Sequence, residues 1–504
     1  MKRISVLILA LLMLVSSFVL TGCDDDDTKK RTRRYTTTET TVTTAVSNDI
    51  TTTTKRPEPI TNPDMRTEGV INEKITKTIY SYDVYYDYSV GDRQAREITY
   101  KGTIKIGNTA ASTGAFATAG GPFNEGLKAY INRINYYGGL GGDYNSGKKG
   151  YYVEFVHYDD GFQPDVGAAY TKKLVEEDKV FALVGHFGTP TVFTTVEYIK
   201  QQGVIACYFA SGYGSLFNAE ADSVKNGSTI FPVQPIYTTE GMIIVARILE
   251  QYPDAKKIGV VYTNDEIGEG LKDGAKAQIE RLGADYECVA SEVSTDATDF
   301  TPAVAKIKDC DVVIVAAIQK DAVSIIKAMI ANGIYKPCFT TYSNASSQLL
   351  LEIKPYYDGL SDDAKAQLPI YTNAWLSSTD LEDFAEFGTD IIACTGENTL
   401  SLNSYAMAGW IAANVFCEGV ERVLDSGKPL NNLTYVEAME SAPIRIKLGT
   451  YTIGSGERID STLDYSDGIR IGTTTMALLK SDDECTTFET AADAKNFIRE
   501  LYAR

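Results

Sequence analysis

The chain has 504 residues, several times the usual size of one domain, so at least two packed units are expected. Hydrophobic residues make up 44% and charged residues 23%, which is typical of globular proteins and excludes fibrous and multi-spanning membrane proteins. The 67 Asp and Glu outnumber the 48 Lys and Arg, and the net charge of -19 argues against nucleic-acid binding.

The N-terminus has the pattern of an export signal. Two basic residues precede an apolar run, residues 4–20, which leads into the sequence LTGC at residues 20–23. This sequence resembles the bacterial lipobox, in which cleavage frees a cysteine that carries acyl chains. We therefore predict a lipoprotein signal peptide over residues 1–22 and lipidation of Cys23, which anchors the chain to the bilayer outside the cytoplasm. An uncleaved anchor helix is the alternative.

Two segments separate the anchor from the folded part. Residues 23–65 are rich in Thr and charged residues and nearly lack large apolar side chains, so we predict a disordered, lipid-anchored stalk. Residues 66–101 form a Tyr-rich lead-in that contains the run YSYDVYYDYS. This run is expected to be a strand packed against the body, and a carbohydrate-binding surface is the alternative.

From residue 102 the spacing of apolar residues alternates between the period of a strand and that of a helix. Helices are expected between successive strands, the first of them ending at a Gly-Gly pair, residues 138–139. The expected strands are 103–107, 151–160, 181–185 and 204–209, and the expected helices are 120–137, 165–178 and 191–203. This succession predicts a parallel sheet with helices on both faces.

The same alternation restarts after residues 231–235, which contain two prolines. The expected strands are 257–262, 286–290, 311–317 and 338–342, and the expected helices are 238–251, 269–282, 302–308 and 322–332. A third stretch adds a helix over 402–424 and a β-rich end over 451–479. Two such α/β units leave a cleft between them, and parallel sheets bind ligands at the carboxyl ends of their strands.

The sequence offers little catalytic chemistry. It lacks the nucleophile-elbow, zinc-protease, EF-hand and dinucleotide-binding motifs. The two histidines, His157 and His186, do not lie beside an obvious nucleophile in the sequence. We therefore predict no enzyme activity, no cofactor and no metal site. The seven cysteines after Cys23 contain no C-x-x-C pair, and their apolar surroundings favour buried free thiols.

Six short sequence segments follow one another in a characteristic order: IKIGNTAASTGAFATAGG, VEFVHYDDGFQP, FALVGHFGTPT, GVIACYFAS, KIGVVYTNDEIGEG and DVVIVAA. Together they resemble the leucine/isoleucine/valine-binding family of ABC-transporter solute-binding proteins. The resemblance implies two Rossmann-like α/β lobes joined by a three-segment hinge, with the ligand cleft between the lobes. The hinge segments would lie near 232–235, 342–345 and 449–452. Lobe 1 would comprise 102–233 and 345–450, and lobe 2 would comprise 234–344 and 451–504.

The resemblance also implies a set of ligand contacts. In amino-acid-binding members a hydroxyl and helix-start amides hold the ligand carboxylate, and Thr189 occupies that position here, where capping of the helix is the alternative role. A glutamate that holds the ligand ammonium is replaced by Tyr342, which argues against an ordinary branched-chain amino acid. The full set of expected contacts is Phe116, Ala119, Phe187, Thr189, Ala210, Ser211, Gly212, Tyr237, Asp265, Ile267, Gln319 and Tyr342.

These expectations describe an extracytoplasmic lipoprotein that captures a small polar solute and delivers it to an ABC permease in the membrane. An anionic or neutral polar head on an apolar or aromatic body is the expected ligand chemistry. A ligand-sensing ectodomain or co-receptor for a membrane signalling partner is the alternative function.

Overall fold

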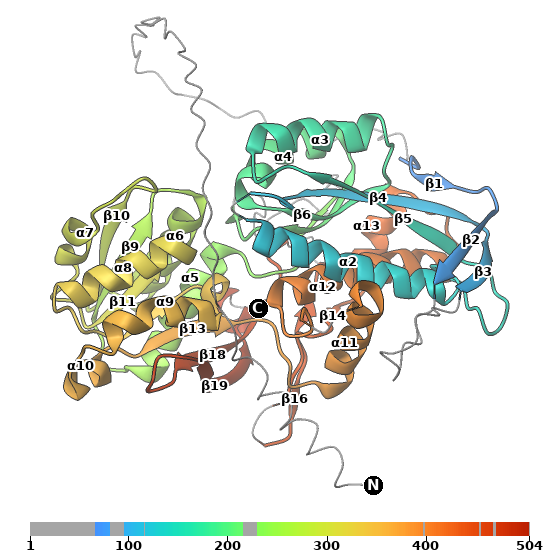
Figure 1. Ribbon diagram of the computed structural model, residues 1–504. Coiled ribbons are helices and arrows are strands. Elements are labelled where there is room, and N and C mark those ends of the chain that lie inside the picture. The colour runs from blue at the N-terminus through green and yellow to red at the C-terminus, as the bar shows by residue number, and fades with distance from the viewer. Residues whose placement is uncertain are drawn as a thin grey trace, which may run out of the picture. The chain divides into compact units, whose positions relative to one another are not determined.

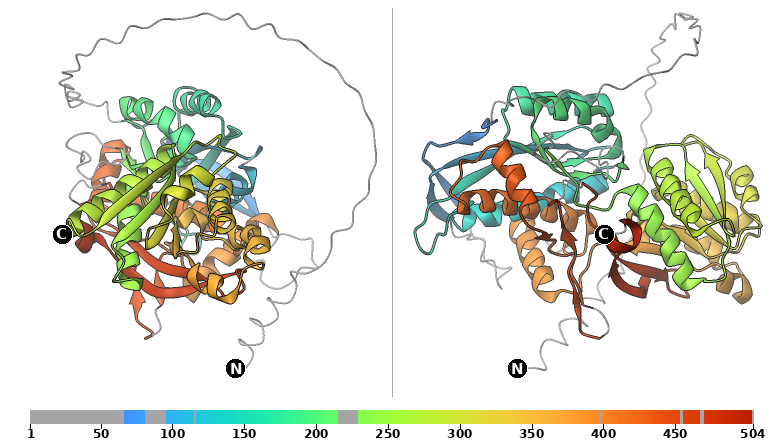
Figure 2. Two further views of the ribbon diagram at one scale, coloured as in Figure 1. Left: turned by 90° about the vertical axis from the view of Figure 1, so that its left-hand side faces the viewer. Right: turned by 180° about the vertical axis from the view of Figure 1, so that it is seen from behind.

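The computed structural model describes residues 66–80, 95–114, 116–214, 229–396, 399–452, 455–466 and 470–502, which are drawn in colour in Figures 1 and 2. The predicted signal peptide, Cys23, the stalk and residues 81–94, which include all of the Tyr-rich run after Tyr80, lie outside these residues. Within the described part, no helix combines the length and the apolar character needed to cross a bilayer.

The first body is built on a six-stranded sheet in the order β1-β4-β6-β7-β8, with β5 paired to β4. All of its pairs are parallel except that of β1 with β4, as the alternation of strand and helix predicts. Its strands are β1 (Val70–Ile71), β4 (Gly102–Ala110), β5 (Tyr151–Asp159), β6 (Ala182–Phe187), β7 (Ile205–Ala210) and β8 (Ile230–Phe231).

Helices cover both faces of this sheet (Figure 1). Neighbouring residues of β6 point to opposite faces, so Leu183 packs in one apolar cluster with Leu174 and Val192, and Val184 packs in another with Trp410. The helices on the Leu183 face are α3 (Pro164–Glu176) and α4 (Thr189–Gln202). The other core includes α2 (Ala117–Tyr136), α11 (Leu381–Thr395), α12 (Ser404–Asp425) and α13 (Asn432–Glu440).

The Tyr-rich lead-in belongs to this body where it is described. The strands β2 (Ile75–Tyr80) and β3 (Ala95–Tyr100) pair antiparallel with each other. The ring of Tyr100 is fully buried, and its hydroxyl donates a hydrogen bond of 2.6 Å to the carbonyl of Asn135 in α2. The described end of the lead-in is therefore packed against α2.

The second body has a seven-stranded sheet in the order β10-β9-β11-β12-β13-β18-β19. The first five strands are parallel, and the last two join antiparallel. The strands are β9 (Lys257–Thr263), β10 (Glu287–Val293), β11 (Val312–Ala316), β12 (Cys338–Thr340), β13 (Ile370–Ala374), β18 (Thr475–Ser481) and β19 (Phe488–Asn496). The helices are α5 (Tyr237–Gln251), α6 (Glu266–Leu282), α7 (Thr301–Lys306), α8 (Gln319–Ala331), α9 (Ser347–Tyr357), α10 (Asp362–Gln367) and α14 (Ile498–Tyr502).

The prediction that 345–450 belongs entirely to the first lobe is wrong. Strand β13 pairs with β12 in the second sheet, and Leu350 in α9 lies in the apolar core of that sheet. After β13 the chain enters the buried core of the first body at Trp375, so the second crossing follows Ala374 rather than Tyr342. The strand was missed because two of its five residues, IYTNA, are the polar Thr372 and Asn373, which makes a weak strand pattern.

The third crossing also lies later than expected. The strand pairs β14 (Ile444–Arg445) with β17 (Thr462–Leu463) and β15 (Tyr451–Thr452) with β16 (Arg458–Ile459) precede it. The side chains of Leu463 and Tyr465 pack in the first core, and the second sheet is rejoined only at Thr475 in β18. The third crossing therefore lies near 471–474 and not at 449–452.

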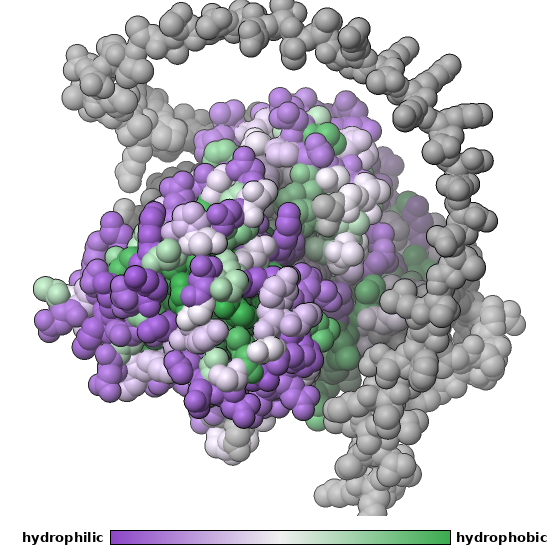
Figure 3. Space-filling model, turned by 60° about the vertical axis from the view of Figure 1, so that its left-hand side comes forward, coloured by the Kyte–Doolittle hydropathy of each residue, from purple (hydrophilic) through white to green (hydrophobic). Residues whose placement is uncertain are grey.

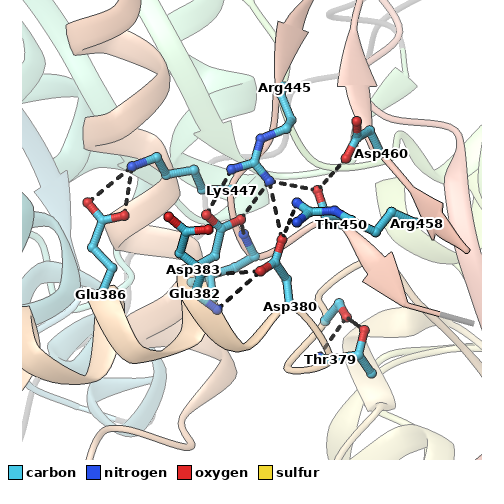
Figure 4. Close-up of polar contacts among 12 residues, drawn as sticks. Thr379, Asp380, Glu382, Asp383, Glu386, Arg445, Lys447, Thr450, Arg458 and Asp460 are labelled. Atoms are coloured by element: carbon cyan, nitrogen blue, oxygen red, sulfur yellow. Dashed lines mark hydrogen bonds and ion pairs between the residues drawn. The ribbon is translucent and has the colours of Figure 1, made fainter. Parts of the chain in front are cut away.

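Charged side chains fix the segment that follows the second crossing (Figure 4). The carboxylate of Asp380 caps α11 and pairs with Arg458 over 2.6 Å. One turn later, Asp383 accepts two hydrogen bonds of 2.8 Å from the guanidinium of Arg445. Both carboxylates are almost fully buried, so this network ties the start of α11 to the strand pairs that precede the third crossing.

The face drawn in Figure 3 consists mainly of hydrophilic residues, with apolar residues showing between them. Five of the seven cysteines after Cys23 are buried thiols, as predicted: Cys207, Cys310, Cys338, Cys417 and Cys485.

Candidate functional site

The first part of the candidate site is the turn from β6 into α4. Gly188 has a φ of 97°, a conformation that suits glycine, and it takes the N-cap position of α4. Thr189 is the first helical residue, and no side chain caps this helix, so the capping role weighed for Thr189 is excluded. Its hydroxyl instead lies 2.9 Å from that of Ser211 and 3.4 Å from that of Tyr237.

The second part is the segment that follows β7. Ala210 ends the strand, and the carbonyl of Gly212 accepts a hydrogen bond of 2.6 Å from the backbone of Tyr237 at the start of α5. A methyl group on Gly212 would lie 2.6 Å from the ring of Tyr237, so glycine is needed for this close approach. The carboxyl ends of β6 and β7 and the start of α5 therefore meet at one cluster of hydroxyl groups.

Gln234, on the first crossing, completes this cluster, and sequence reasoning did not assign it a role. Its amide oxygen faces the backbone N–H groups of Ser211 and Gly212, each at 3.2 Å, and the hydroxyl of Tyr342 at 2.9 Å. Its amide nitrogen donates to the hydroxyl of Tyr208 over 2.9 Å. The opposite orientation would bring the amide nitrogen against two N–H donors, so the hydrogen-bond network assigns the oxygen to that side.

Two tyrosines come together at this place. The rings of Tyr237 and Tyr342 are stacked with their centroids 6.4 Å apart. Burial raises the pKa of Tyr237 to about 12 and raises that of Tyr342 well above its usual value, so both phenols stay neutral. The hydroxyl of Tyr342 also lies 2.9 Å from the carbonyl of Pro235, which directs it toward the first crossing.

A buried acid missed by sequence reasoning supports Tyr342. Glu240, in α5, is fully buried, and its carboxyl oxygens accept hydrogen bonds of 2.6 Å from the hydroxyl of Thr341 and from the backbone of Tyr342. Burial raises the pKa of Glu240 to about 8. A glutamate inside the otherwise apolar stretch GMIIVA is the sequence signal that could have identified it.

The predicted aromatic contacts of the first body lie at the start of α2 and the end of β6. Phe116 stacks on Phe162 with the ring centroids 3.8 Å apart. Ala119 is buried in the first turn of α2. The ring of Phe187 packs edge-on against Phe123 at 5.4 Å and Tyr405 at 6.5 Å. These side chains form an apolar wall on the same body as Thr189.

The predicted contacts of the second body have local roles. Asp265 caps α6, accepting hydrogen bonds from the backbone of Gly268 at 2.8 Å and the hydroxyl of Thr263 at 2.9 Å. Ile267 is buried. Gln319 is exposed at the start of α8, and its side chain hydrogen-bonds Tyr405 of the first body. Asp265 is therefore already engaged, although its charge raises the pKa of nearby Tyr237.

The two histidines differ in environment. His186 is fully buried, with a pKa lowered to about 3 by burial, and Nε2 lies 2.9 Å from the hydroxyl of Thr171. His157 does lie beside a hydroxyl, contrary to the sequence reading, because its Nε2 is 2.8 Å from Ser112 Oγ. The backbone amides of Ser112 and Thr113 donate to Asp159, so these contacts hold the turn after β4 in place.

Within the described ranges, no three His, Cys, Asp or Glu side chains are grouped in a way that could hold a metal ion. The candidate site is instead a cluster of neutral hydroxyl and amide groups contributed by both bodies. It lies where the carboxyl ends of β6 and β7 meet α5 and the segment after β12.

Two α/β bodies joined by three crossings define the type I periplasmic-binding-protein fold. The Periplasmic binding protein family matches residues 103–461, and the chain belongs to this family. The resemblance to leucine/isoleucine/valine-binding proteins is thereby confirmed, as is the predicted fold class.

Similar proteins include an amino acid binding protein of Pseudomonas aeruginosa, 25% identical over 46% of this chain and 58% of its own length. A Leu/Ile/Val-binding protein homolog of Brucella melitensis is 23% identical over 51% of this chain and 65% of its own length. The chain thus spans less than two thirds of the length of these relatives.

Solved structures with the same fold include a branched-chain amino acid ABC transporter protein from Thermus thermophilus with bound valine. Its TM-score is 0.62 at 15% identity, over 80% of this chain and 99% of that one. A fatty acid ABC transporter substrate-binding protein from Thermomonospora curvata gives a TM-score of 0.59 at 20% identity, over 78% of this chain and 92% of that one.

Proposed function

We propose that the chain is an extracytoplasmic solute-binding lipoprotein that captures a small polar solute and delivers it to an ABC importer. The observation that carries this proposal is the convergence of Thr189 and Ser211, at the carboxyl ends of β6 and β7, with Tyr237 and Tyr342 from the other body. A polar cluster at strand ends between two α/β bodies is suited to a small solute.

Each body contributes different chemistry to the proposed site. The first offers hydroxyl groups and the start of α4, a 14-residue helix whose N-terminal amides favour a hydrogen-bond acceptor. It also offers the apolar wall of Phe116, Phe162 and Phe187. The second offers the neutral phenol of Tyr342, with no acid at that position to neutralise an ammonium group. This combination suits a polar head on an apolar body.

Binding would bring the two bodies together around the solute. The three crossings are the segments that change conformation in such a closure, and a permease then distinguishes the closed from the open form. The predicted lipid on Cys23 would keep the protein close to the permease.

A thermal-shift screen tests this function. The panel comprises amino acids, short peptides, amides, nucleosides and small organic acids, applied to the purified chain. A solute at 100 times its dissociation constant stabilises the folded state by about 2.7 kcal/mol, which is a measurable shift. Solution scattering on the same samples should show a smaller radius of gyration with that solute. A full panel without any stabilising solute would contradict the proposed function.

A further inference from the structure

We propose that Gln234 sets the class of solute that binds: its amide oxygen occupies the place of an anion, so the site selects solutes with a neutral polar head and rejects carboxylates, free amino acids included. This inference rests on the proposed function and decides between the anionic and neutral heads that the sequence left open.

The first observation is the convergence of two backbone donors on one internal oxygen. The N–H groups of Ser211 and Gly212 lie 3.2 Å from the amide oxygen of Gln234. Adjacent backbone amides that point at one acceptor form the kind of concavity that binds anions in many proteins. Here the acceptor is part of the chain, and it is a neutral carbonyl oxygen.

The second observation is that the Gln234 side chain is held in place. Only 9% of Gln234 is exposed. Its nitrogen donates to the fully buried Tyr208, and its oxygen also faces the hydroxyl of Tyr342. A solute carboxylate would have to break all of these contacts and leave the displaced amide to find new partners in a buried region. Leaving buried polar groups unpaired is costly, so the displacement is disfavoured.

The third observation is the charge around the cluster. Thr189, Ser211 and the tyrosines carry hydroxyls, and burial keeps the phenols protonated. Burial and, after it, the negative charge of Asp265 raise the pKa of Tyr237, whereas Glu240 keeps its proton because burial raises its own pKa to about 8. Among the described residues, no Lys or Arg hydrogen-bonds the hydroxyl groups of this cluster, so a desolvated carboxylate would have no cation in contact there. Hydroxyl groups donate and accept, so they match the hydroxyl or carboxamide of a neutral head.

The test compares three probes that share one branched body: 4-methylpentanamide, 4-methylpentanoate and leucine, which are neutral, anionic and zwitterionic. Calorimetry on the full chain should give at least tenfold tighter binding of the amide than of the other two. Gln234→Ala frees the two backbone amides, so it should bind 4-methylpentanoate at least tenfold more tightly than the unmodified chain. Gln278→Ala is the matched control, because Gln278 is equally buried, at 9% exposure, and lies on α6.

Tighter binding of 4-methylpentanoate or leucine than of the amide by the unmodified chain would overturn the inference. An unchanged ratio of affinities in Gln234→Ala would overturn it as well. These results leave the proposed function intact, because a solute has still bound. Binding of none of the three probes to either chain would contradict the solute class stated here, and the wider screen then decides on the function separately.

Hydrogen exchange provides a readout without any solute. The amides of Ser211 and Gly212 should exchange slowly in the unmodified chain and at least tenfold faster in Gln234→Ala. The amide of Tyr237, which donates to the carbonyl of Gly212, is the internal reference and should stay slow in both chains. Fast exchange of Ser211 and Gly212 in the unmodified chain would overturn the inference, whatever the probes do.

Discussion

The buried carboxyl group of Glu240 accepts a hydrogen bond of 2.6 Å from the backbone N–H of Tyr342. Tyr342 occupies the position at which the sequence resemblance predicts a glutamate in amino-acid-binding proteins. The carboxyl group of Glu240 therefore lies close to that position, although it belongs to another segment. It comes from α5 and supports the segment from within. Both carboxyl oxygens of Glu240 already have partners inside the protein, because the backbone of Tyr342 donates to one and the hydroxyl of Thr341 donates to the other.

This burial makes stability depend on pH. The pKa of Glu240 is raised to about 8, above its ordinary value of 4.5, so the folded chain holds a proton that the unfolded chain has lost. The contribution to stability is fully present below pH 4.5 and is lost as the pH rises to about 8. Glu240→Gln keeps the shape without the titration. The free energy of unfolding of the unmodified chain should therefore fall relative to that of Glu240→Gln between pH 5 and 8, as followed by urea denaturation.

The difference between the two chains is the quantity to measure, because His157 and His186 titrate in both and cancel. Glu280→Gln is the control, since Glu280 is exposed on α6 in an ion pair with Lys276. Its effect should stay below about 1 kcal/mol at every pH. A difference between the unmodified chain and Glu240→Gln that does not change with pH would show that Glu240 is ionised in the folded protein.

Asp383 should be a major support of the segment after the second crossing. Asp383→Asn removes the charge that faces Arg445 and leaves the guanidinium without its main partner. We expect a loss of about 3 kcal/mol in the free energy of unfolding, the lower end for a broken buried pair. Glu437→Gln removes half of an exposed pair with Lys428 and should cost less than about 1 kcal/mol. Equal losses in the two variants, measured by denaturant unfolding, would contradict the role of the network.

The anchor can be tested independently of the site. Replacing Cys23 with Ala removes the thiol that the LTGC motif offers for acylation. The variant should remain an unprocessed precursor or leave the membrane fraction, and it should take up no radiolabelled fatty acid. Cys485→Ala changes a buried cysteine of the second body and should leave labelling unchanged. Continued labelling of the Cys23 variant would place the lipid elsewhere.

The order of strands and helices could be predicted because most elements carry strong apolar periods. Strand β6, with the sequence ALVGHF, is fully buried, and its pattern was clear. The sequence could not show that β13 belongs to the second sheet, because this depends on its pairing with β12, from which two helices separate it. Pairing partners are set by tertiary packing, which a single sequence does not display. This is why the second and third crossings were placed too early.

The candidate site likewise combines features that the sequence shows with contacts that only the folded chain shows. Strand ends and helix starts are visible in the sequence, so Thr189, Ser211 and Tyr237 could be selected as candidates. The roles of Gln234 and Glu240 depend on which backbone N–H groups face them, and that becomes visible only in the folded chain. The contact of His157 with Ser112 was missed for the same reason, since 45 residues separate them.

Thr189 provides the most direct test of the site. Thr189→Ala removes a hydroxyl that lies within hydrogen-bond distance of Ser211 and Tyr237. Binding of the solute that stabilises the chain most in the thermal-shift screen should weaken by about 1 to 3 kcal/mol, roughly 5- to 150-fold in Kd, because a hydrogen bond to the polar head is lost. Thr189→Ser keeps the hydroxyl and should recover most of the affinity. Thr194→Ala changes an exposed threonine of the same helix and should bind like the unmodified chain. Calorimetry gives Kd, and thermal unfolding without solute shows whether the variant is folded. Full affinity in a folded Thr189→Ala chain would place the head of the solute away from the start of α4.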